Sequence, residues 1–499
     1  MAASTGQVQV VEGMFGGWKR PSQAGLLGLS MKATMGLFGV AVLLVILIGV
    51  GGLWAGLKLG VPLGVVVAGF SIKDRDGVSF FGKVGERMAW WQAKAEGRNV
   101  YRAGPASKVT GGRWRLPGIA APLQLLEQQD HYGHPFGLLV CPWQRTVSVV
   151  LGCEPAGLGL VDEDESFRWV CGWSDELTNL GLDAEVVSMQ VTVETAPDTG
   201  RRLQQVMLSR VDPDAPEFAR RVLTDTVESH LGRSNQVSTW VTITWSTSQL
   251  GRRAKDPQAL GDMVAARLPD LFGGLVAAGA GSVWALSASE IAEIVRVAFD
   301  PPAAAWFDET RAKGQTPPIA WGDVGPTTAV AAWAGYRHDS AWSKTWAMTR
   351  APEGLVNLKV LRSLMAPHPD IPRKRVSLLY RPIPPGRAAE LVDKDMKAAS
   401  AARANKKGPE VIESLAFQQA QQTAAEQAAG AGLAQFGLLV TATTDRLEDK
   451  DQIDVAVKGL SSSARLRLRP MFGGQDTGFL ACLPLGLMLE RFSILPKGL

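Results

Sequence analysis

The most strongly apolar part of the chain lies near its N-terminus. Residues 33–57 carry no charged side chain, and residues 59–72 form a second uncharged run after Lys58. At 1.5 Å per residue the first run reaches about 37 Å, which exceeds the roughly 30 Å hydrocarbon core of a bilayer. The second run reaches only about 21 Å. It becomes long enough to cross the bilayer if the helix starts at Leu53 and the Lys58 side chain extends toward the lipid headgroups. The pattern predicts a transmembrane helical hairpin over residues 32–73.

The flanking charges predict how this hairpin is oriented. The run starts too late and is too long for a cleaved signal peptide. Both flanks are basic, and basic flanks stay in the cytoplasm, so we expect an even number of crossings with the large domain in the cytoplasm. If residues 59–72 do not cross, the large domain would lie outside. The flanking cations are Lys19, Arg20 and Lys32 before the run and Lys73, Arg75, Lys83, Arg87, Lys94, Arg98 and Arg102 after it.

Residues 77–97 mix aromatic and aliphatic side chains with charged ones at helical spacing. They predict an amphipathic helix beside the membrane, with Trp90 and Trp91 at the interface. A helix packed on the soluble domain fits the same pattern.

Beyond this helix, segments of alternating polarity interchange with segments of helical periodicity. We expect an α+β fold with ferredoxin-like strand–helix units, and no repeat of 20–50 residues is evident. Strands are expected over 136–141, 146–153, 186–194, 237–245, 375–381, 436–443 and 465–469. Helices are expected over 163–180, 217–231, 259–277, 287–299, 353–365 and 450–460, with an apolar helix or turn over 478–489. Residues 385–430 form one long helix or an antiparallel pair broken near 406–409.

These elements suggest a division of the chain into five parts. A Pro- and Ala-rich stretch, residues 301–324, is the best boundary within the soluble part. The expected parts are a cytoplasmic tail (1–31), the hairpin (32–73), the amphipathic helix with its linker (74–118), and two α/β parts (119–324 and 325–499).

Composition and charge narrow the range of partners. With 46% hydrophobic and 20% charged residues, the chain is typical of folded proteins. Residues 1–102 contain 11 Lys or Arg and 5 Asp or Glu, whereas the remainder contains 41 and 43. The body is therefore faintly acidic, which argues against nucleic acid as a direct partner. The four cysteines show no paired spacing, so we expect buried thiols in a reducing compartment and no disulfide framework.

Two motifs have weak chemical signatures. Residues 77–84 match the spacing of a phosphate-binding loop, but Val84 replaces the hydroxyl side chain that would hold Mg²⁺. His131 and His134 lie near Cys141, but a zinc site requires more ligands with recognisable pairing. The histidines are better explained by a polar turn before a strand.

Two further groups of residues contain side-chain types that occur in catalytic sites, but their arrangement does not fit catalysis. His338, Asp339 and Ser340 are triad residue types, but neighbouring residues point in different directions and triad partners converge from separate segments. The acidic run 162–165 fits the start of a helix, where carboxylates favour the helix dipole. We therefore expect no catalytic residue, no metal and no cofactor.

Arg465, Arg467 and Arg469 alternate with leucines and would line one face of a strand. Such a row fits a docking face for an acidic partner. It also fits a solvated edge strand, where charges prevent aggregation.

Two regions resemble parts of type IV secretion systems. The N-terminal pattern, with Trp18-Lys19-Arg20-Pro21, the Gly-rich apolar hairpin and residues 73–77, resembles PrgI-like and VirB-type small membrane subunits. The C-terminal passage through residues 436–443, 465–469 and 479–486 resembles the non-motor N-terminal domain of TrbE/CagE/TraC-type secretion ATPases. The chain ends soon after this passage, where those ATPases continue into the motor domain.

Taken whole, the chain resembles an actinobacterial family of membrane proteins found with conjugation genes. The segments that carry this resemblance are residues 101–105, 192–197, 366–371 and 375–384. The resemblance implies a non-enzymatic inner-membrane scaffold, part of an oligomeric complex, that anchors and docks a separate secretion ATPase.

Two alternative functions are compatible with the sequence. An EccE-like component of a type VII secretion system also pairs two N-terminal spans with a cytoplasmic α/β domain. A membrane-tethered enzyme is the alternative of another class, and its motif support is poor.

Overall fold

The computed structural model describes most of the chain from residue 78 to residue 489. Within this part, no helix is long and apolar enough to cross a membrane. The predicted tail and transmembrane hairpin lie outside the described residues except at a few isolated positions. The described residues are 14–15, 38–39, 42, 49, 74, 78–104, 107 and 116–489, with gaps at 158, 160, 201–203, 205–206, 208–210, 213, 231–233, 353–355, 405–410 and 429.

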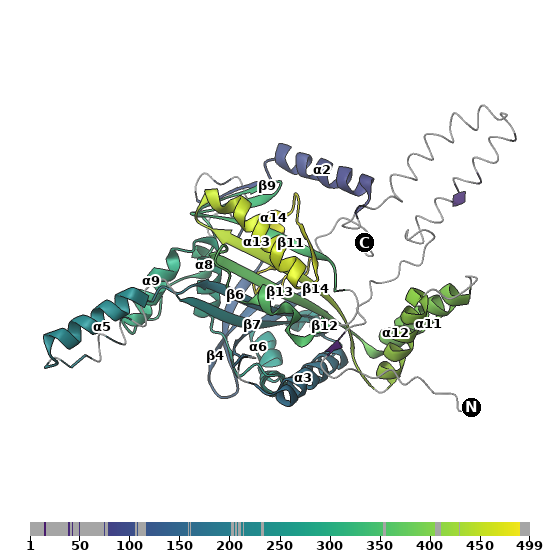
Figure 1. The fold of residues 1–499 in the computed structure, drawn as a ribbon, viewed down its shortest axis with the longest axis horizontal. Coiled ribbons are helices and arrows are strands. Elements are labelled where there is room, and N and C mark those ends of the chain that lie inside the picture. The colour runs from purple at the N-terminus through teal and green to yellow at the C-terminus, as the bar shows by residue number, and fades with distance from the viewer. Residues whose placement is uncertain are drawn as a thin grey trace.

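One large antiparallel sheet organises the body, and the predicted α+β class is confirmed (Figure 1). Its strands come from both sides of the boundary expected near residue 324, so both soluble parts contribute to the same sheet. The strands are β2 (Val100–Arg102), β3 (Gln124–Gln129), β4 (Pro135–Cys141), β5 (Thr146–Glu154), β6 (Val186–Pro197), β7 (Asn235–Ser246), β8 (Ser282–Ala285), β9 (Thr328–Ala332), β10 (Gly335–His338), β11 (Ala341–Arg350), β13 (Arg373–Ile383), β14 (Leu433–Thr444) and β15 (Arg467–Pro470). A separate two-stranded ladder joins β1 (Met14–Phe15) to β12 (Val356–Asn357).

The sheet consists of two halves with the same topology. The first half has the order β3-β4-β5-β7-β6, with β8 paired to β5. The second has the order β9-β10-β11-β14-β13, with β15 paired to β11. The halves meet where β6 and β13 pair antiparallel, which relates them by an approximate two-fold axis. This duplication was not predicted, because its unit spans far more than the 20–50 residues of a solenoid repeat.

Equivalent side chains support this correspondence. In the first half, the hydroxyls of Ser148 on β5 and Thr244 on β7 lie 2.9 Å apart. In the second half, those of Ser343 on β11 and Thr443 on β14 lie 2.7 Å apart. The helices also correspond, because α8 (Ala288–Phe299) follows β8 as α14 (Gln475–Ala481) follows β15.

Helices cover both faces of the sheet. On one face, α8 and α14 share a core in which Phe299 and Phe479 are fully buried. On the other, α3 (Glu163–Leu182), α6 (Pro257–Ala265) and α7 (Leu268–Ala277) cover the first half. Helices α10 (Arg362–Met365) and α13 (Lys450–Ser463) cover the second half on that same face.

Each half also carries a helical arm between its two central strands. In the first half, α5 (Glu217–His230) lies between β6 and β7. In the second, α11 (Pro385–Ala404) and α12 (Val411–Ala428) lie between β13 and β14. The arms project from opposite sides of the body (Figure 1). Residues 385–430 therefore form two helices, which was one of the two predicted arrangements.

Three expected elements differ from the structure. Residues 353–365 were expected to be one helix, but β12 pairs with β1 there and only the short helix η5 (Leu358–Leu361) and α10 follow. The helix expected over 259–277 is two helices, because Pro269 starts a new one and Arg267 at the break binds Asp183 and Glu185. At the C-terminal end, α14 stops at Ala481 and an irregular segment follows.

This irregular segment crosses the sheet. Gly486 has a φ of 64°, in the left-handed region that favours glycine. A Cβ atom there would lie 2.1 Å from the Ser148 hydroxyl oxygen, so only glycine allows the backbone to approach the first half this closely. We call residues 482–489 the crossing segment.

Candidate functional site

Helix α2 (Phe80–Ala95) lies at the point where the chain enters the described body. Ser79 caps it by accepting a hydrogen bond from the Gly82 N–H at 3.1 Å. Residues 80–84, which belong to the stretch that matches the spacing of a phosphate-binding loop, are therefore part of a helix and do not form such a loop. The helix predicted over 77–97 is confirmed, and it packs on the body as the second interpretation of that pattern expected.

A series of aromatic and charged side chains fastens α2 to the sheet. Arg469 on β15 makes two hydrogen bonds to the carboxylate of Glu86 on α2, at 2.7 and 3.2 Å. The Arg87 guanidinium lies 4.5 Å from the ring centroid of Trp333. That ring stacks on Phe472 at an interplanar angle of 15°, and Trp90 meets it edge-on at 5.6 Å. We call these six residues the α2 dock.

The three predicted docking arginines occupy different positions. Arg469 belongs to the α2 dock, and its side chain is only 15% exposed. Arg465 is exposed in a turn with φ of 52°, one residue before Leu466 enters the core. The strand begins at Arg467, which is half-buried, rather than at Arg465 as predicted. The row therefore does not form one continuous docking face, because its last member contacts this chain's own helix.

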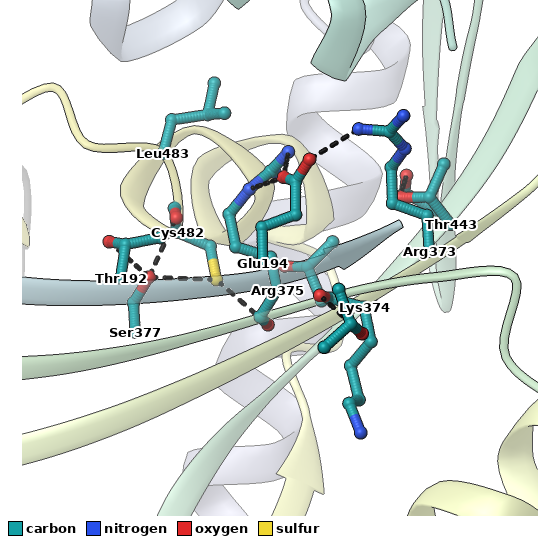
Figure 2. Close-up of polar contacts among 12 residues, drawn as sticks. Thr192, Glu194, Arg373, Lys374, Arg375, Ser377, Thr443, Cys482 and Leu483 are labelled. Carbon is teal, nitrogen blue, oxygen red and sulfur yellow. Dashed lines mark hydrogen bonds and ion pairs between the residues drawn. The ribbon is translucent and has the colours of Figure 1, made fainter. Parts of the chain in front are cut away.

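A buried ion cluster lies beside the two-fold axis, where the halves meet (Figure 2). Glu194 on β6 lies between Arg375 and Arg373 on β13, with Arg375 Nε 2.6 Å from a carboxylate oxygen. Burial alone would raise the pKa of Glu194, but the two guanidinium groups hold this pKa below its ordinary value. The sequence shows the basic run 373–375 but not its buried partner, which lies 179 residues away from Arg373.

Lys374 points to the opposite side of the strand (Figure 2) and donates a hydrogen bond to the Ala366 carbonyl oxygen at 2.5 Å. Burial lowers the pKa of this ammonium group to about 8.

The crossing segment is held by polar side chains of the central strands. Gln190 donates hydrogen bonds to the carbonyl oxygens of Ala481 and Leu483, at 3.1 and 2.9 Å. The Ser377 hydroxyl donates to the Cys482 carbonyl oxygen at 2.8 Å (Figure 2). Cys482 is completely buried, and burial raises the pKa of its thiol. These contacts tie the C-terminal end of the described chain to both halves.

The remaining candidate motifs have structural roles in the described chain. His338 is buried between the Phe299 carbonyl oxygen and the Ser343 hydroxyl, and burial lowers its pKa to about 4. His134 lies in the turn between β3 and β4, where Asp130 accepts its backbone N–H at 2.8 Å. Asp162 is the N-cap of α3, and the acidic residues after it occupy the first turn, as predicted. No cluster of three His, Cys, Asp or Glu side chains suited to a metal ion occurs among the described residues.

One shallow cavity of about 290 Å³ lies between α8 and α9 (Ala303–Ala312). Trp306, Phe307 and Ile319 line it together with the paired Arg296 and Asp300. Arg296 also binds Asp339 and the Gly325 carbonyl oxygen, so its charge holds the surrounding loops together.

Comparison with protein families gives a match to the N-terminal part of the chain. A domain of unknown function, DUF8461, matches residues 22–81, which include both uncharged runs and the first residues of α2. No curated protein matches the chain. The matched region is thus similar to a recurring domain whose description assigns no activity.

Proposed function

We propose that the chain is a non-enzymatic scaffold subunit of a conjugative type IV secretion system. In this proposal residues 32–73 anchor it in the cytoplasmic membrane as a helical hairpin. The sheet body, which we interpret as ferredoxin-like units, lies in the cytoplasm and docks a separate secretion ATPase. The proposal combines the uncharged N-terminal runs, the resemblance of both ends of the chain to secretion proteins, and the geometry of the α2 dock.

The α2 dock is the observation that carries this proposal. A flexible tether would leave the body free to move relative to the membrane, whereas a scaffold must hold its partners in position. Arg469 and Glu86 form a bidentate pair, and such pairs fix orientation as well as distance. The stacked Trp333 and Phe472 rings and the Trp90 edge contact restrict the helix further. The geometry thus supports a rigid link between the membrane-proximal helix and the sheet.

Three titratable groups of the described body whose pKa values are shifted also fit a scaffold. Glu194, His338 and Lys374 each have a hydrogen-bond partner within the fold, and none of the three lines the cavity between α8 and α9.

Topology and partner capture test this function. We expect reporters fused after Arg102 and after Leu499 to give cytoplasmic signals. The full chain, purified in mild detergent from its native cells, should retain a separate hexameric-type secretion ATPase. External signals, or a lone monomer in several detergents, would contradict the proposal.

Charge removal then tests the docking arginines. Arg465→Asn tolerates the left-handed backbone, and combined with Arg467→Gln it should reduce ATPase recovery. Arg387→Gln on the exposed start of α11 is the matched control and should leave recovery unchanged. Equal recovery from both variants would assign docking to another surface.

A further inference from the structure

We propose that the outer face of α2 rests on an anionic lipid surface. This inference rests on the proposed membrane anchoring and specifies which part of the body meets the bilayer. Four large apolar side chains of α2 point away from the body. Phe80 is 62% exposed, Val84 37%, Met88 65% and Trp91 61%. They follow one another at intervals of four, four and three residues, which places them on one face of the helix.

The apolar face and the docked face lie on different sides of the same helix. The half-buried positions are Phe81, Gly82, Glu86, Trp90 and Ala93, and the last four share the spacing of a single stripe. Glu86 and Trp90 make the contacts of the α2 dock. The exposed stripe is therefore not an unfinished part of the body's core, because the helix already uses another face to pack against the sheet.

The positive charges on and beside α2 indicate which kind of surface its exposed apolar face would contact. Lys83, Arg87, Lys94 and Arg98 carry positive charge along the helix and the turn after it, and all four are exposed. The described acidic residues beside these cations are Asp74, bound by Lys83 at 2.6 Å, Glu86, bound by Arg469, and Glu96, bound by Arg98 at 2.7 Å. Exposed apolar residues flanked by cations are typical of helices that lie in the interface of anionic membranes.

Chain length places the helix within reach of the bilayer. The second uncharged run ends at Ile72, eight residues before Phe80. Eight residues span at most about 28 Å even when fully extended. If residues 32–73 form the membrane anchor, α2 therefore starts within about 28 Å of the membrane. The bilayer is then close enough to contact its exposed apolar face.

Site-directed spin labelling of the full chain tests this inference. Cys171 is the one exposed cysteine among the four, so Cys171→Ser leaves three buried thiols as the background. Met88→Cys reports the apolar face of α2. Val455→Cys on α13, 73% exposed, is the matched control on the body. The labelled protein is placed in nanodiscs of phosphatidylcholine with or without phosphatidylglycerol, and collision with oxygen and with a water-soluble nickel complex is measured.

At position 88 we expect a several-fold higher ratio of oxygen to nickel collision than at position 455, and a larger ratio when phosphatidylglycerol is present. Lys83→Gln with Lys94→Gln should remove the increase that the anionic lipid causes. A label at position 88 that is as water-accessible as the one at 455 would overturn the inference. So would a label shielded from both reagents, because that result indicates a protein contact. Neither result affects ATPase capture or reporter topology, so the proposed function is tested separately.

Discussion

Thr192 and Ser377 face each other in the β6–β13 ladder, and their hydroxyl oxygens lie 3.0 Å apart. Because β6 and β13 are corresponding strands, this pair marks the approximate two-fold axis of the body. On one side of it Glu194 faces Arg375, whereas on the other Gln190 faces Leu379. The two halves thus share their topology but differ in chemistry at the junction: one side holds the ion cluster and the other binds the crossing segment.

Removing the carboxylate of the ion cluster should destabilise the body. Glu194→Gln leaves two buried guanidinium groups without their counter-charge, which we expect to cost about 3–5 kcal/mol of unfolding free energy. Because the folded pKa of Glu194 is lowered, its contribution is present above the unfolded value of about 4.5 and is lost as pH falls through the folded value. Denaturant unfolding of the detergent-solubilised chain at pH 7 and pH 4 measures both effects.

The matched control is Glu217→Gln, which removes one partner of the exposed Glu217–Arg221 pair. It should change the unfolding free energy by less than about 0.5 kcal/mol. An equally small effect of Glu194→Gln would contradict a structural role for the cluster.

Glu176 should make stability depend on pH in the opposite direction. This carboxyl group on α3 is 4% exposed and packs against Gly274 on α7. Burial, assisted by the nearby Asp270, raises its pKa to about 7. The unfolded group ionises at a lower pH than the folded one, so the unfolding free energy falls between about pH 4.5 and pH 7 and stays reduced above it.

Glu176→Gln should therefore stabilise the protein at pH 8 by about 1–3 kcal/mol and have little effect at pH 4. Thermal unfolding at the two pH values measures the difference. Glu163→Gln, in the exposed first turn of the same helix, is the control. A variant less stable than the wild type at pH 8 would refute the proposed cost of this carboxylate.

Breaking the α2 dock should loosen the helix while the sheet remains folded. Arg469→Gln removes a half-buried ion pair and should increase amide hydrogen exchange throughout α2, with a loss of about 1–2 kcal/mol in unfolding free energy. Arg98→Gln breaks the exposed pair with Glu96 and should leave exchange in α2 unchanged. Unchanged exchange in both variants would show that the aromatic contacts alone hold the helix.

Gln190 should control access to the Cys482 thiol. Gln190→Met keeps the side-chain volume but leaves the carbonyl oxygens of Ala481 and Leu483 without their donor, at a cost of about 1–3 kcal/mol each. We expect the crossing segment to open more often and Cys482 to react faster with a thiol reagent. Gln258→Met at the exposed start of α6 is the control. Mass spectrometry of the labelled peptide distinguishes Cys482 from the exposed Cys171.

Local patterns predicted most of the elements but not their assembly. The predicted strands 186–194 and 436–443 lie within β6 and β14, because alternating polarity is a property of the strand itself. The single helix predicted over residues 353–365 was wrong, because β12 pairs there with β1, which lies more than 300 residues earlier in the chain. Strands β9, β10 and β11 were not predicted, and they form a consecutive antiparallel meander that includes Trp342 and Trp346.

The sites were harder to predict than the elements. The sequence indicates the amphipathic character of α2, because its apolar residues recur at helical spacing. It gives no sign that Arg469 meets Glu86, or that Trp333 and Phe472 complete the α2 dock, because these residues are brought together only by the fold. Trp333 gave no signal in the sequence, because the strands that place it in a tight turn, β9 and β10, were themselves not predicted.

Strand β2 makes the two ends of the duplicated sheet different, because only one of them is connected directly to α2. It follows α2 directly and pairs with β9, whereas β3, the counterpart of β9, has no described strand beyond it at the opposite end of the sheet. A force that arrives through α2 therefore acts directly on the second half, and it reaches the first half through the β6–β13 ladder, the core that α8 and α14 share, and the crossing segment. The two halves, although built alike, thus stand in different relations to the N-terminal part of the chain: the second half holds α2 through the α2 dock, and the first half carries no counterpart of β2.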